Sequence, residues 1–174
     1  MRSDEALVQI VDAAFAEAAR RSGAWLVCRP GCAQCCLGEF AITQLDAVRL
    51  RRGLADLAER DAERAARVRQ RARAIVERVA PMADDEPCPA LDPVTGTCDL
   101  YAARPITCRA FGPPVRCESG DVGVCELCYE GATDEQIAAC AVDADSEELE
   151  AELVREVEEQ VGVRGETTVA QALA

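Results

Sequence analysis

Four of the eleven cysteines of this 174-residue chain lie within one short segment, Cys28-Arg-Pro-Gly-Cys32-Ala-Gln-Cys35-Cys36. A single buried cysteine packs as a small apolar residue, but four on one tight Pro-Gly loop cannot all be interior. Thiolates are the usual ligands of structural zinc and of iron–sulfur clusters. The segment therefore predicts a metal site in which Cys28, Cys32 and Cys35 are three near ligands and a further ligand comes from elsewhere.

A second cysteine region supplies candidates for the distant ligand. Cys88 and Cys98 flank a turn sequence at 92–96, which predicts a hairpin or paired turns that bring the two thiols together at its base. Cys108 follows, after one or two predicted helical turns. The predicted metal ligands are Cys28, Cys32, Cys35, Cys36, Cys88, Cys98 and Cys108.

A third group, Cys117, Cys125, Cys128 and Cys140, leaves three alternatives open. These cysteines could complete the first metal site, form a second metal site, or belong to an addition to the domain that lies outside both. Cys125 and Cys128 form a C-x2-C pair, which is typical of zinc ligands. Cys140 lies on the apolar face of a predicted helix, so we expect it in the core.

The spacing leaves the metal open. Three near ligands and one distant ligand are common for iron–sulfur clusters, whereas structural zinc more often uses two C-x2-C pairs. All-thiolate ligation suits zinc, iron and a 4Fe–4S cluster alike. Side chains of adjacent residues in extended backbone point to opposite faces, so we expect Cys35 and Cys36 not to bind one metal in the same way. That implies either a spare thiol or two neighbouring metals.

Composition excludes several classes of function. The chain has no histidine and no lysine, which excludes histidine-containing zinc sites, catalytic triads and Schiff-base chemistry. A net charge of -13 argues against nucleic-acid binding. The charge is uneven: residues 49–80 carry ten arginines, while 133–174 carry twelve acids. We interpret these regions as solvated helix faces of opposite sign that can also pair with each other.

The sequence also predicts the cellular location of the protein and the redox state of its cysteines. The N-terminus is acidic, and no apolar run reaches membrane-spanning length, so we expect a cytoplasmic protein without a membrane segment. Thiols stay reduced in that compartment, and an odd number of cysteines fits poorly with a fully paired disulfide framework.

Scarce aromatic residues imply a core of Ala, Leu and Val, which favours a mainly α fold with short strands around a loop-dominated metal site. We expect one domain over 1–174, with a cysteine module at about 24–130 and an acidic helical region at 133–174. Helices are predicted after the caps Ser3, Thr43 and Thr133, and another from Asp145 or Ser146. Gly53 is expected to end the second helix, and a longer helix to run from there to about residue 80.

An ordered set of residues carries a family resemblance. Its parts are Cys28-x3-Cys32-x2-Cys35-Cys36, Cys88-Pro-x-Leu, Thr97-Cys98-x2-Tyr101 and Arg104-Pro-x2-Cys108-Arg109. The set resembles the YkgJ-type cysteine-cluster family, whose members are described as zinc- or iron-chelating proteins. The resemblance implies metal chelation by the matching cysteines and implies no particular reaction.

Three functions remain as hypotheses. The first is a binding module that holds zinc, iron or an iron–sulfur cluster. The second is an enzyme that uses this centre for methyl transfer, by analogy with a flagellin lysine methylase whose cysteine module resembles the family, or for thiol redox chemistry. The third is a zinc scaffold that docks a protein through its arginine-rich helix.

Three residues near the cysteines have expected structural roles. We expect Arg104 and Arg109 to brace the cysteine loop and Asp99 to be solvated at the surface.

Overall fold

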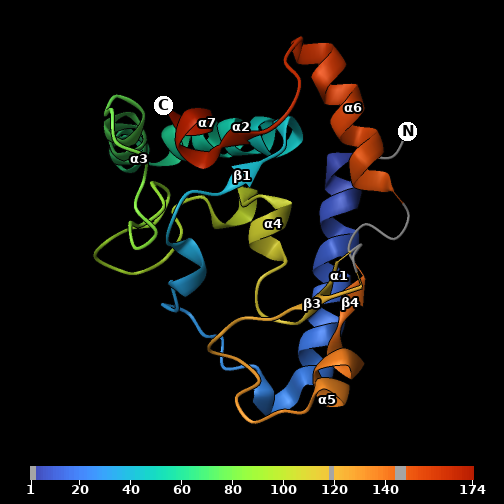
Figure 1. The fold of residues 1–174 in the computed structure, drawn as a ribbon. Coiled ribbons are helices and arrows are strands. Elements are labelled where there is room, and N and C mark those ends of the chain that lie inside the picture. The colour runs from blue at the N-terminus through green and yellow to red at the C-terminus, as the bar shows by residue number, and fades with distance from the viewer. Residues whose placement is uncertain (1–2, 118–119, 144–147) are drawn as a thin grey trace. The chain divides into compact units, whose positions relative to one another are not determined.

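A computed structural model of the chain describes residues 3–117, 120–143 and 148–174 (Figure 1). The predicted mainly helical fold is confirmed, because every strand in these ranges is only two residues long. The chain forms two compact units. Unit 1 comprises Met1–Arg29 and Ile106–Arg155, and unit 2 comprises Pro30–Pro105 and Glu156–Ala174. The predicted cysteine module at 24–130 contributes residues to both units, and the expectation of one domain stays a prediction.

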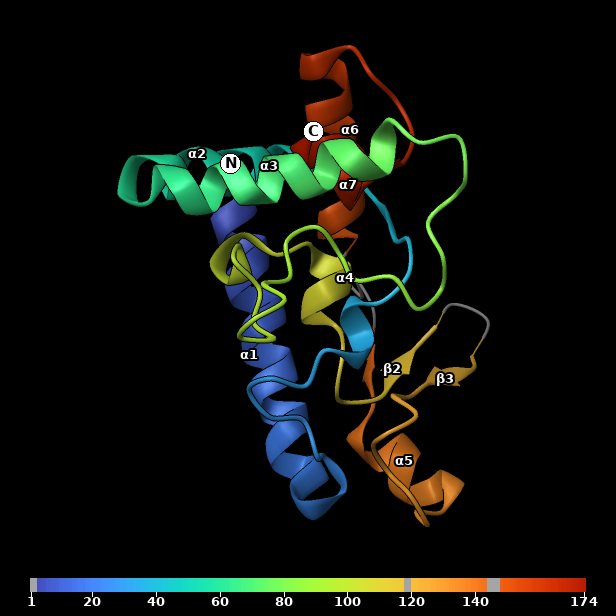
Figure 2. The same cartoon turned by 90° about the vertical axis from the view of Figure 1, so that its left-hand side faces the viewer.

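Unit 2 is built on two long helices and the C-terminal segment. Its elements are η2 (Gln34–Cys36), β1 (Ala41–Ile42), α2 (Gln44–Arg60), α3 (Ala62–Val76), η3 (Tyr101–Ala103), β5 (Thr167–Thr168) and α7 (Val169–Leu173). The helices α2, α3 and α7 pack on one another, and α2 and α3 run side by side in Figure 2. Strands β1 and β5 pair antiparallel, with Ala41 opposite Thr168.

Local sequence sets where the helices of unit 2 begin. The hydroxyl of Thr43 accepts a hydrogen bond from the N–H of Asp46, so α2 starts at the predicted cap. The predicted break at Gly53 is wrong, because α2 continues to Arg60. The helical conformation is interrupted instead at Asp61, between α2 and α3. The carboxylate of Asp61 accepts a hydrogen bond from the N–H of Arg64 and caps α3.

Gly53 is explained by packing. A Cβ at this position would lie 2.2 Å from the Cβ of Ala103 in η3. Only glycine allows α2 and η3 to approach this closely, and the contact outweighs the weak helix propensity of glycine.

The core of unit 2 consists of small and medium aliphatic side chains, as the composition predicts. They come from β1, α2, α3, the segment 90–100 and α7, and they pack against Cys88 and Cys98. The last residues are therefore part of the core, since Val169, Ala172 and Leu173 are buried within it. The buried members of this core are Ile42, Ala47, Leu50, Leu54, Leu57, Ala65, Val68, Ala72, Ala90, Leu100, Val169, Ala172 and Leu173.

Unit 1 is organised around its first helix. Its elements are α1 (Asp4–Ser22), η1 (Gly23–Trp25), α4 (Ile106–Arg109), β2 (Val115–Arg116), β3 (Val122–Gly123), α5 (Asp134–Cys140), β4 (Val142–Asp143) and the first half of α6 (Leu149–Val161). The predicted caps Ser3 and Thr133 are confirmed. In the small sheet, β2 pairs antiparallel with β3 and parallel with β4.

Side-chain contacts fix α1 against the rest of unit 1. The buried guanidinium of Arg109 on α4 donates to both carboxylate oxygens of Asp12, at 2.8 and 2.7 Å. Arg109 therefore ties α4 to α1, whereas its expected role is to brace the cysteine loop. The predicted helix start at 145 or 146 lies outside the described residues. Among the described residues, no helix has the length and apolar character needed to cross a membrane.

We expect Gly53→Ala to lower the free energy of unfolding by about 1–3 kcal/mol, because the new Cβ overlaps Ala103. The loss should appear in urea unfolding followed by circular dichroism. Ala103→Gly in the same chain should restore part of it. If Gly53→Ala were as stable as the wild type, helix propensity rather than the close approach would govern this position.

Candidate metal centre

The first and second cysteine segments of unit 2 are held together by backbone pairing. The N–H of Cys88 donates to the carbonyl of Cys36 at 2.7 Å, and the N–H of Gly38 donates to Glu86 at 2.8 Å. Leu37 and Pro87 form an antiparallel bridge between these two bonds. Residues about 50 positions apart in the chain are thus in register without any help from their side chains.

The predicted hairpin between Cys88 and Cys98 is confirmed. Leu91 pairs with Cys98, and the N–H of Asp99 donates to the carbonyl of Ala90 at 2.7 Å. The carboxylate of Asp92 accepts from the N–H groups of Val94 and Thr95, which closes the turn. Cys88 and Cys98 meet at its base, where both pack against the core of unit 2.

Two arginines of α3 hold this hairpin. The Asp99 side chain is only 1% exposed and forms ion pairs with Arg64 and with Arg71, the latter at 2.7 Å. Arg71 also donates to the carbonyl of Pro89 at 2.8 Å. The expectation that Asp99 is solvated at the surface is therefore wrong. The carboxylate next to Cys98 fixes the hairpin on α3, which the residue type alone did not reveal.

Cys35 and Cys36 both lie in η2, a 3-10 turn, and a side-chain hydrogen bond between them is the first cause of their opposite pKa shifts. The prediction that their side chains point to opposite faces assumed extended backbone, and the backbone here is not extended.

The two thiols differ strongly in acidity. The hydrogen bond from Cys36 lowers the pKa of Cys35 to about 6 against the opposing effect of burial, and the positive charge of Arg104 contributes. The pKa of Cys36 is raised, first by donating that bond, then by burial and by the charges of Cys35, Cys88 and Cys98. The pair therefore loses its first proton more readily than an isolated cysteine does.

The sulfurs of the hairpin accept backbone hydrogen bonds. Burial raises the pKa of Cys88 to about 11, while the N–H groups of Ala90 and Leu91 donate to its sulfur and oppose the shift. Burial also raises the pKa of Cys98, whose sulfur accepts from the N–H of Leu100. Such donors stabilise a metal-bound thiolate, which is a stronger acceptor than a thiol.

The seven predicted ligands divide between the units. Cys32, Cys35, Cys36, Cys88 and Cys98 belong to unit 2, and Cys28 and Cys108 belong to unit 1. Within unit 2, the loop that carries Cys32 packs against the hairpin, because a Cβ on Gly96 would lie 3.6 Å from the carbonyl oxygen of Gly31. Backbone pairing and the hairpin thus place the segments that carry Cys35, Cys36, Cys88 and Cys98 side by side.

Unit 1 contains a further group of cysteines. The Sγ atoms of Cys28 and Cys128 lie 3.9 Å apart. Cys128 and Cys140 are buried in a small cluster with Tyr129, and Cys125 packs against it, so the prediction that Cys140 is a core residue is confirmed. The C-x2-C spacing of Cys125 and Cys128 is the sequence signal for this group.

All eleven cysteines lie in the described part of the chain, and none forms a disulfide. In the same residues, no three Cys, Asp or Glu side chains already converge on a point that could hold a metal ion. Rotation about the Cα–Cβ bonds would be needed to turn the thiols of η2 and the hairpin toward one centre. The donor set itself suits zinc or iron, because it consists of soft thiolates whose sulfurs accept hydrogen bonds from backbone N–H groups.

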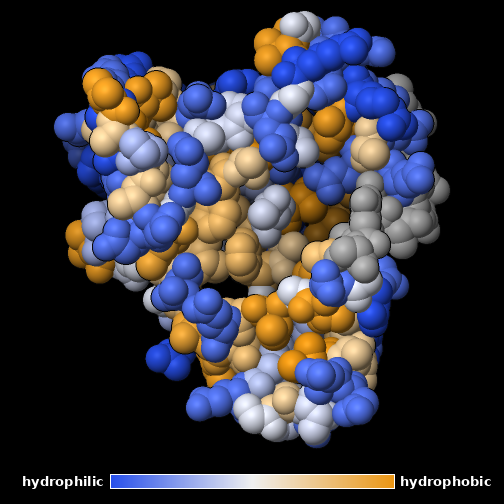
Figure 3. Space-filling model, viewed as in Figure 1, coloured by the Kyte–Doolittle hydropathy of each residue, from blue (hydrophilic) through white to orange (hydrophobic). Residues whose placement is uncertain are grey.

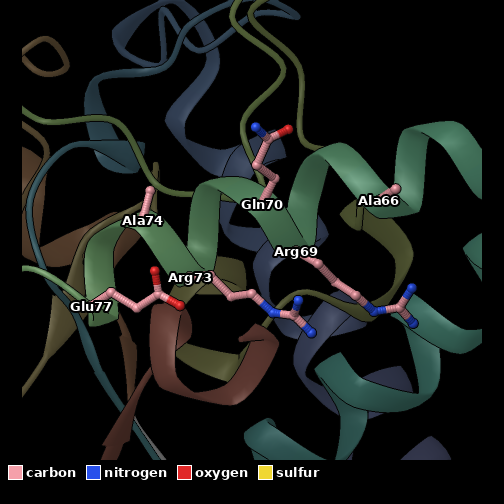
Figure 4. A pocket seen from close by; sticks show the side chains of 6 residues that line it. All are labelled: Ala66, Arg69, Gln70, Arg73, Ala74 and Glu77. Atoms are coloured by element: carbon pink, nitrogen blue, oxygen red, sulfur yellow. The ribbon is translucent and has the colours of Figure 1, made fainter.

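The arginine-rich helix α3 also has an outward side. Figure 4 shows a hollow along it, lined by Ala66, Arg69, Gln70, Arg73, Ala74 and Glu77. Its lining contains no thiol, and Arg73 donates to the carbonyl of Ala174 at 3.1 Å. Arginines of the 49–80 region therefore have structural partners within unit 2, and the hollow is separate from the cysteines.

Residues 27–128 match the model of the CxxCxxCC family, described as a "putative zinc- or iron-chelating domain". The chain belongs to this family. The match covers more than half of the chain and includes the cysteines of η2 and the hairpin. Cys32, Cys35 and Cys36 fit the end of the family pattern, while Cys28 precedes Cys32 with one more intervening residue than the pattern has. Neither curated proteins nor solved structures match the chain.

Replacing Cys36 should change the reactivity of Cys35 in the metal-free protein. Cys36→Ala removes the donor that lowers the pKa of Cys35, so that pKa should rise toward the ordinary value. Alkylation of Cys35 at pH 7, followed by mass spectrometry, should become at least several-fold slower. Cys36→Ser keeps a hydroxyl donor and should retain most of the rate. Equal rates in all three proteins would contradict the hydrogen bond.

Asp99→Asn should destabilise unit 2 by about 1–3 kcal/mol. Breaking a buried ion pair costs about 3–5 kcal/mol, and the loss here is smaller because both arginines are partly exposed. Thermal unfolding of the metal-free protein should show the effect. The matched control is Asp56→Asn, an exposed position on α2. A melting temperature equal to that of the control would contradict the clamp.

Proposed function

We propose that unit 2 chelates a single zinc ion through Cys35, Cys36, Cys88 and Cys98. The observation that carries the proposal is the backbone pairing of the two cysteine segments: the N–H of Cys88 donates to the carbonyl of Cys36 at 2.7 Å, and Cys98 lies on the hairpin that begins at Cys88. The four cysteines of these segments supply a complete tetrahedral donor set. Membership of the family supports chelation of zinc or iron in general.

The adjacency of Cys35 and Cys36 favours one ion over a cluster. Both lie in the single 3-10 turn η2, and each affects the pKa of the other. Two ligands of one zinc ion are about 3.8 Å apart, given a Zn–S bond of about 2.3 Å and tetrahedral angles. In a four-iron cluster each cysteine binds a different iron, so its sulfurs stand farther apart. The adjacent pair therefore supports a mononuclear site.

The chain's own residues would hold and tune the ion. Backbone N–H groups of Ala90, Leu91 and Leu100 donate to the hairpin sulfurs, and the charge of Arg104 offsets part of the thiolate charge. Cys36 must release its proton on binding, so zinc affinity should fall as the pH decreases. Because all four donors are cysteines, no coordination position stays open for a substrate, which favours a binding or structural role over catalysis.

Zinc would also stabilise unit 2. Its two cysteine segments are far apart in the chain, and its core is built from small aliphatic side chains. An ion bound only by the folded chain adds its binding free energy to stability. The proposed function is therefore metal chelation that holds these segments in place. Cys32, the fifth cysteine of the unit, stays a predicted ligand.

The test is metal content. We expect Cys88→Ser and Cys98→Ser each to lose one zinc ion per chain relative to the wild type, measured by elemental analysis after purification without chelators. Cys117→Ser, an exposed cysteine of unit 1, is the matched control and should lose none. Unchanged zinc in both hairpin variants would overturn the site. A brown protein that carries iron and sulfide in place of zinc would overturn the choice of metal.

A further inference from the structure

The cysteines of unit 1 repeat a local structure found in unit 2. In Cys88-Pro-Ala-Leu91, the N–H of Leu91 donates to the carbonyl of Cys88 at 2.9 Å, and two backbone N–H groups donate to the cysteine sulfur. In Cys125-Glu-Leu-Cys128, the N–H of Cys128 donates to the carbonyl of Cys125 at 2.9 Å. The sulfur of Cys125 again accepts from the backbone N–H groups two and three positions later.

This turn prepares a cysteine sulfur for a metal. Its N–H groups aim partial positive charge at the sulfur, and the C-x2-C spacing lets the second cysteine reach the same ion. After burial, Cys128 also contributes to the raised pKa of Cys125. The two cysteines therefore lie on one turn and affect each other.

A third sulfur comes from a distant part of unit 1. The Sγ of Cys28 lies 3.9 Å from the Sγ of Cys128, although the residues are 100 positions apart. This distance is far longer than a disulfide bond of about 2.05 Å. It matches the sulfur–sulfur edge of a tetrahedral zinc site, about 3.8 Å for Zn–S bonds of about 2.3 Å.

The loop after α4 also approaches Cys28 closely. A Cβ on Gly112 would lie 3.5 Å from the Cys28 sulfur and 3.4 Å from a methyl carbon of Leu26, and its φ of +114° suits only glycine. The loop after α4 therefore lies against this exposed cysteine, whose sulfur lies beside that of Cys128.

Cys140 is the fourth sulfur. It is 6% exposed at the end of α5 and shares a buried cluster with Cys128 and Tyr129. Tyr129 joins the cysteines to the N-terminal segment, because its N–H donates to the carbonyl of Trp25 at 3.0 Å and its hydroxyl is hydrogen-bonded to Ser22. The guanidinium of Arg21 donates to the carbonyl of Cys140 at 3.3 Å.

We propose that unit 1 binds a zinc ion of its own through Cys28, Cys125, Cys128 and Cys140, whose thiols would turn toward one centre by rotation about their Cα–Cβ bonds. The chain would then bind one ion in each unit. The ion in unit 1 would tie η1 to the segment 125–140, beside a surface where apolar side chains gather around β3 and α5 (Figure 3). This proposal does not depend on the site in unit 2, because the two ligand sets share no residue.

The experiment counts zinc and cobalt(II) in the full-length chain under reducing conditions. The wild type should bind two ions. Cys28→Ser and Cys125→Ser should each bind one, and the control Cys117→Ser should bind two. Cobalt(II) bound to Cys88→Ser should show the intense ligand-field bands of a tetrahedral thiolate site, which reports on unit 1 alone. Cys28 is exposed, so its replacement keeps the test valid if Cys125→Ser fails to fold.

Three results would overturn the proposal. The first is two ions in Cys28→Ser and Cys125→Ser, which would leave the proposed function of unit 2 intact. The second is one ion in the wild type that is lost in both Cys28→Ser and Cys88→Ser, since that indicates a single shared site. The third is a disulfide between Cys28 and Cys128 in the purified protein, detected as a loss of two hydrogens by mass spectrometry. Unchanged metal in Cys88→Ser with loss in Cys28→Ser would refute only the unit 2 site.

Discussion

Backbone pairing between residues 36–38 and 86–88 is the constraint on which unit 2 depends. These hydrogen bonds fix two cysteine segments relative to each other whatever rotamers their thiols adopt. The segments carry few large apolar side chains, so they cannot be positioned by packing alone. With the segments paired, Cys88 and Cys98 pack against the core of unit 2.

The arginine-rich helix contributes to this arrangement rather than to a general charge balance. Arg64 and Arg71 of α3 both reach Asp99, and Arg78, which follows α3, pairs with Glu86 at 2.6 Å. Each of these acids lies within two residues of a cysteine of the hairpin. Against the larger effect of burial, the positive charges of Arg104 and Arg64 act to lower the pKa of Cys98 and would offset the mutual repulsion of thiolates bound to a metal. Three of the ten arginines of the basic region, Arg64, Arg71 and Arg78, thus support the cysteine segments.

Sequence predicted the features that depend on neighbours along the chain. The caps at Ser3, Thr43 and Thr133 and the hairpin after Cys88 follow from local hydrogen bonding. Prediction from the sequence failed where contacts between residues far apart in the chain determine the conformation or burial of a residue. Helix propensity placed a break at Gly53, but the close approach of Ala103 explains that glycine. Solvation was expected for Asp99 because its partners on α3 cannot be recognised from spacing, and Cys35 and Cys36 were assigned to opposite faces because a 3-10 turn was not foreseen.

The division of the cysteines into two groups has the same origin. Along the sequence, Cys28 belongs with Cys32 and Cys35, and three near thiols suggest one site with a distant fourth. In the fold, the chain passes from unit 1 to unit 2 between Arg29 and Pro30, so the loop is shared. The sulfur of Cys28 lies beside that of Cys128, whereas the segment with Cys35 and Cys36 pairs through its backbone with the residue at the base of the hairpin, Cys88. A turn with the same N–H donors to sulfur occurs in each unit, at Cys88 and at Cys125. Spacing identified the chemistry of these cysteines, and the long-range pairing of the backbone determines which of them can act together.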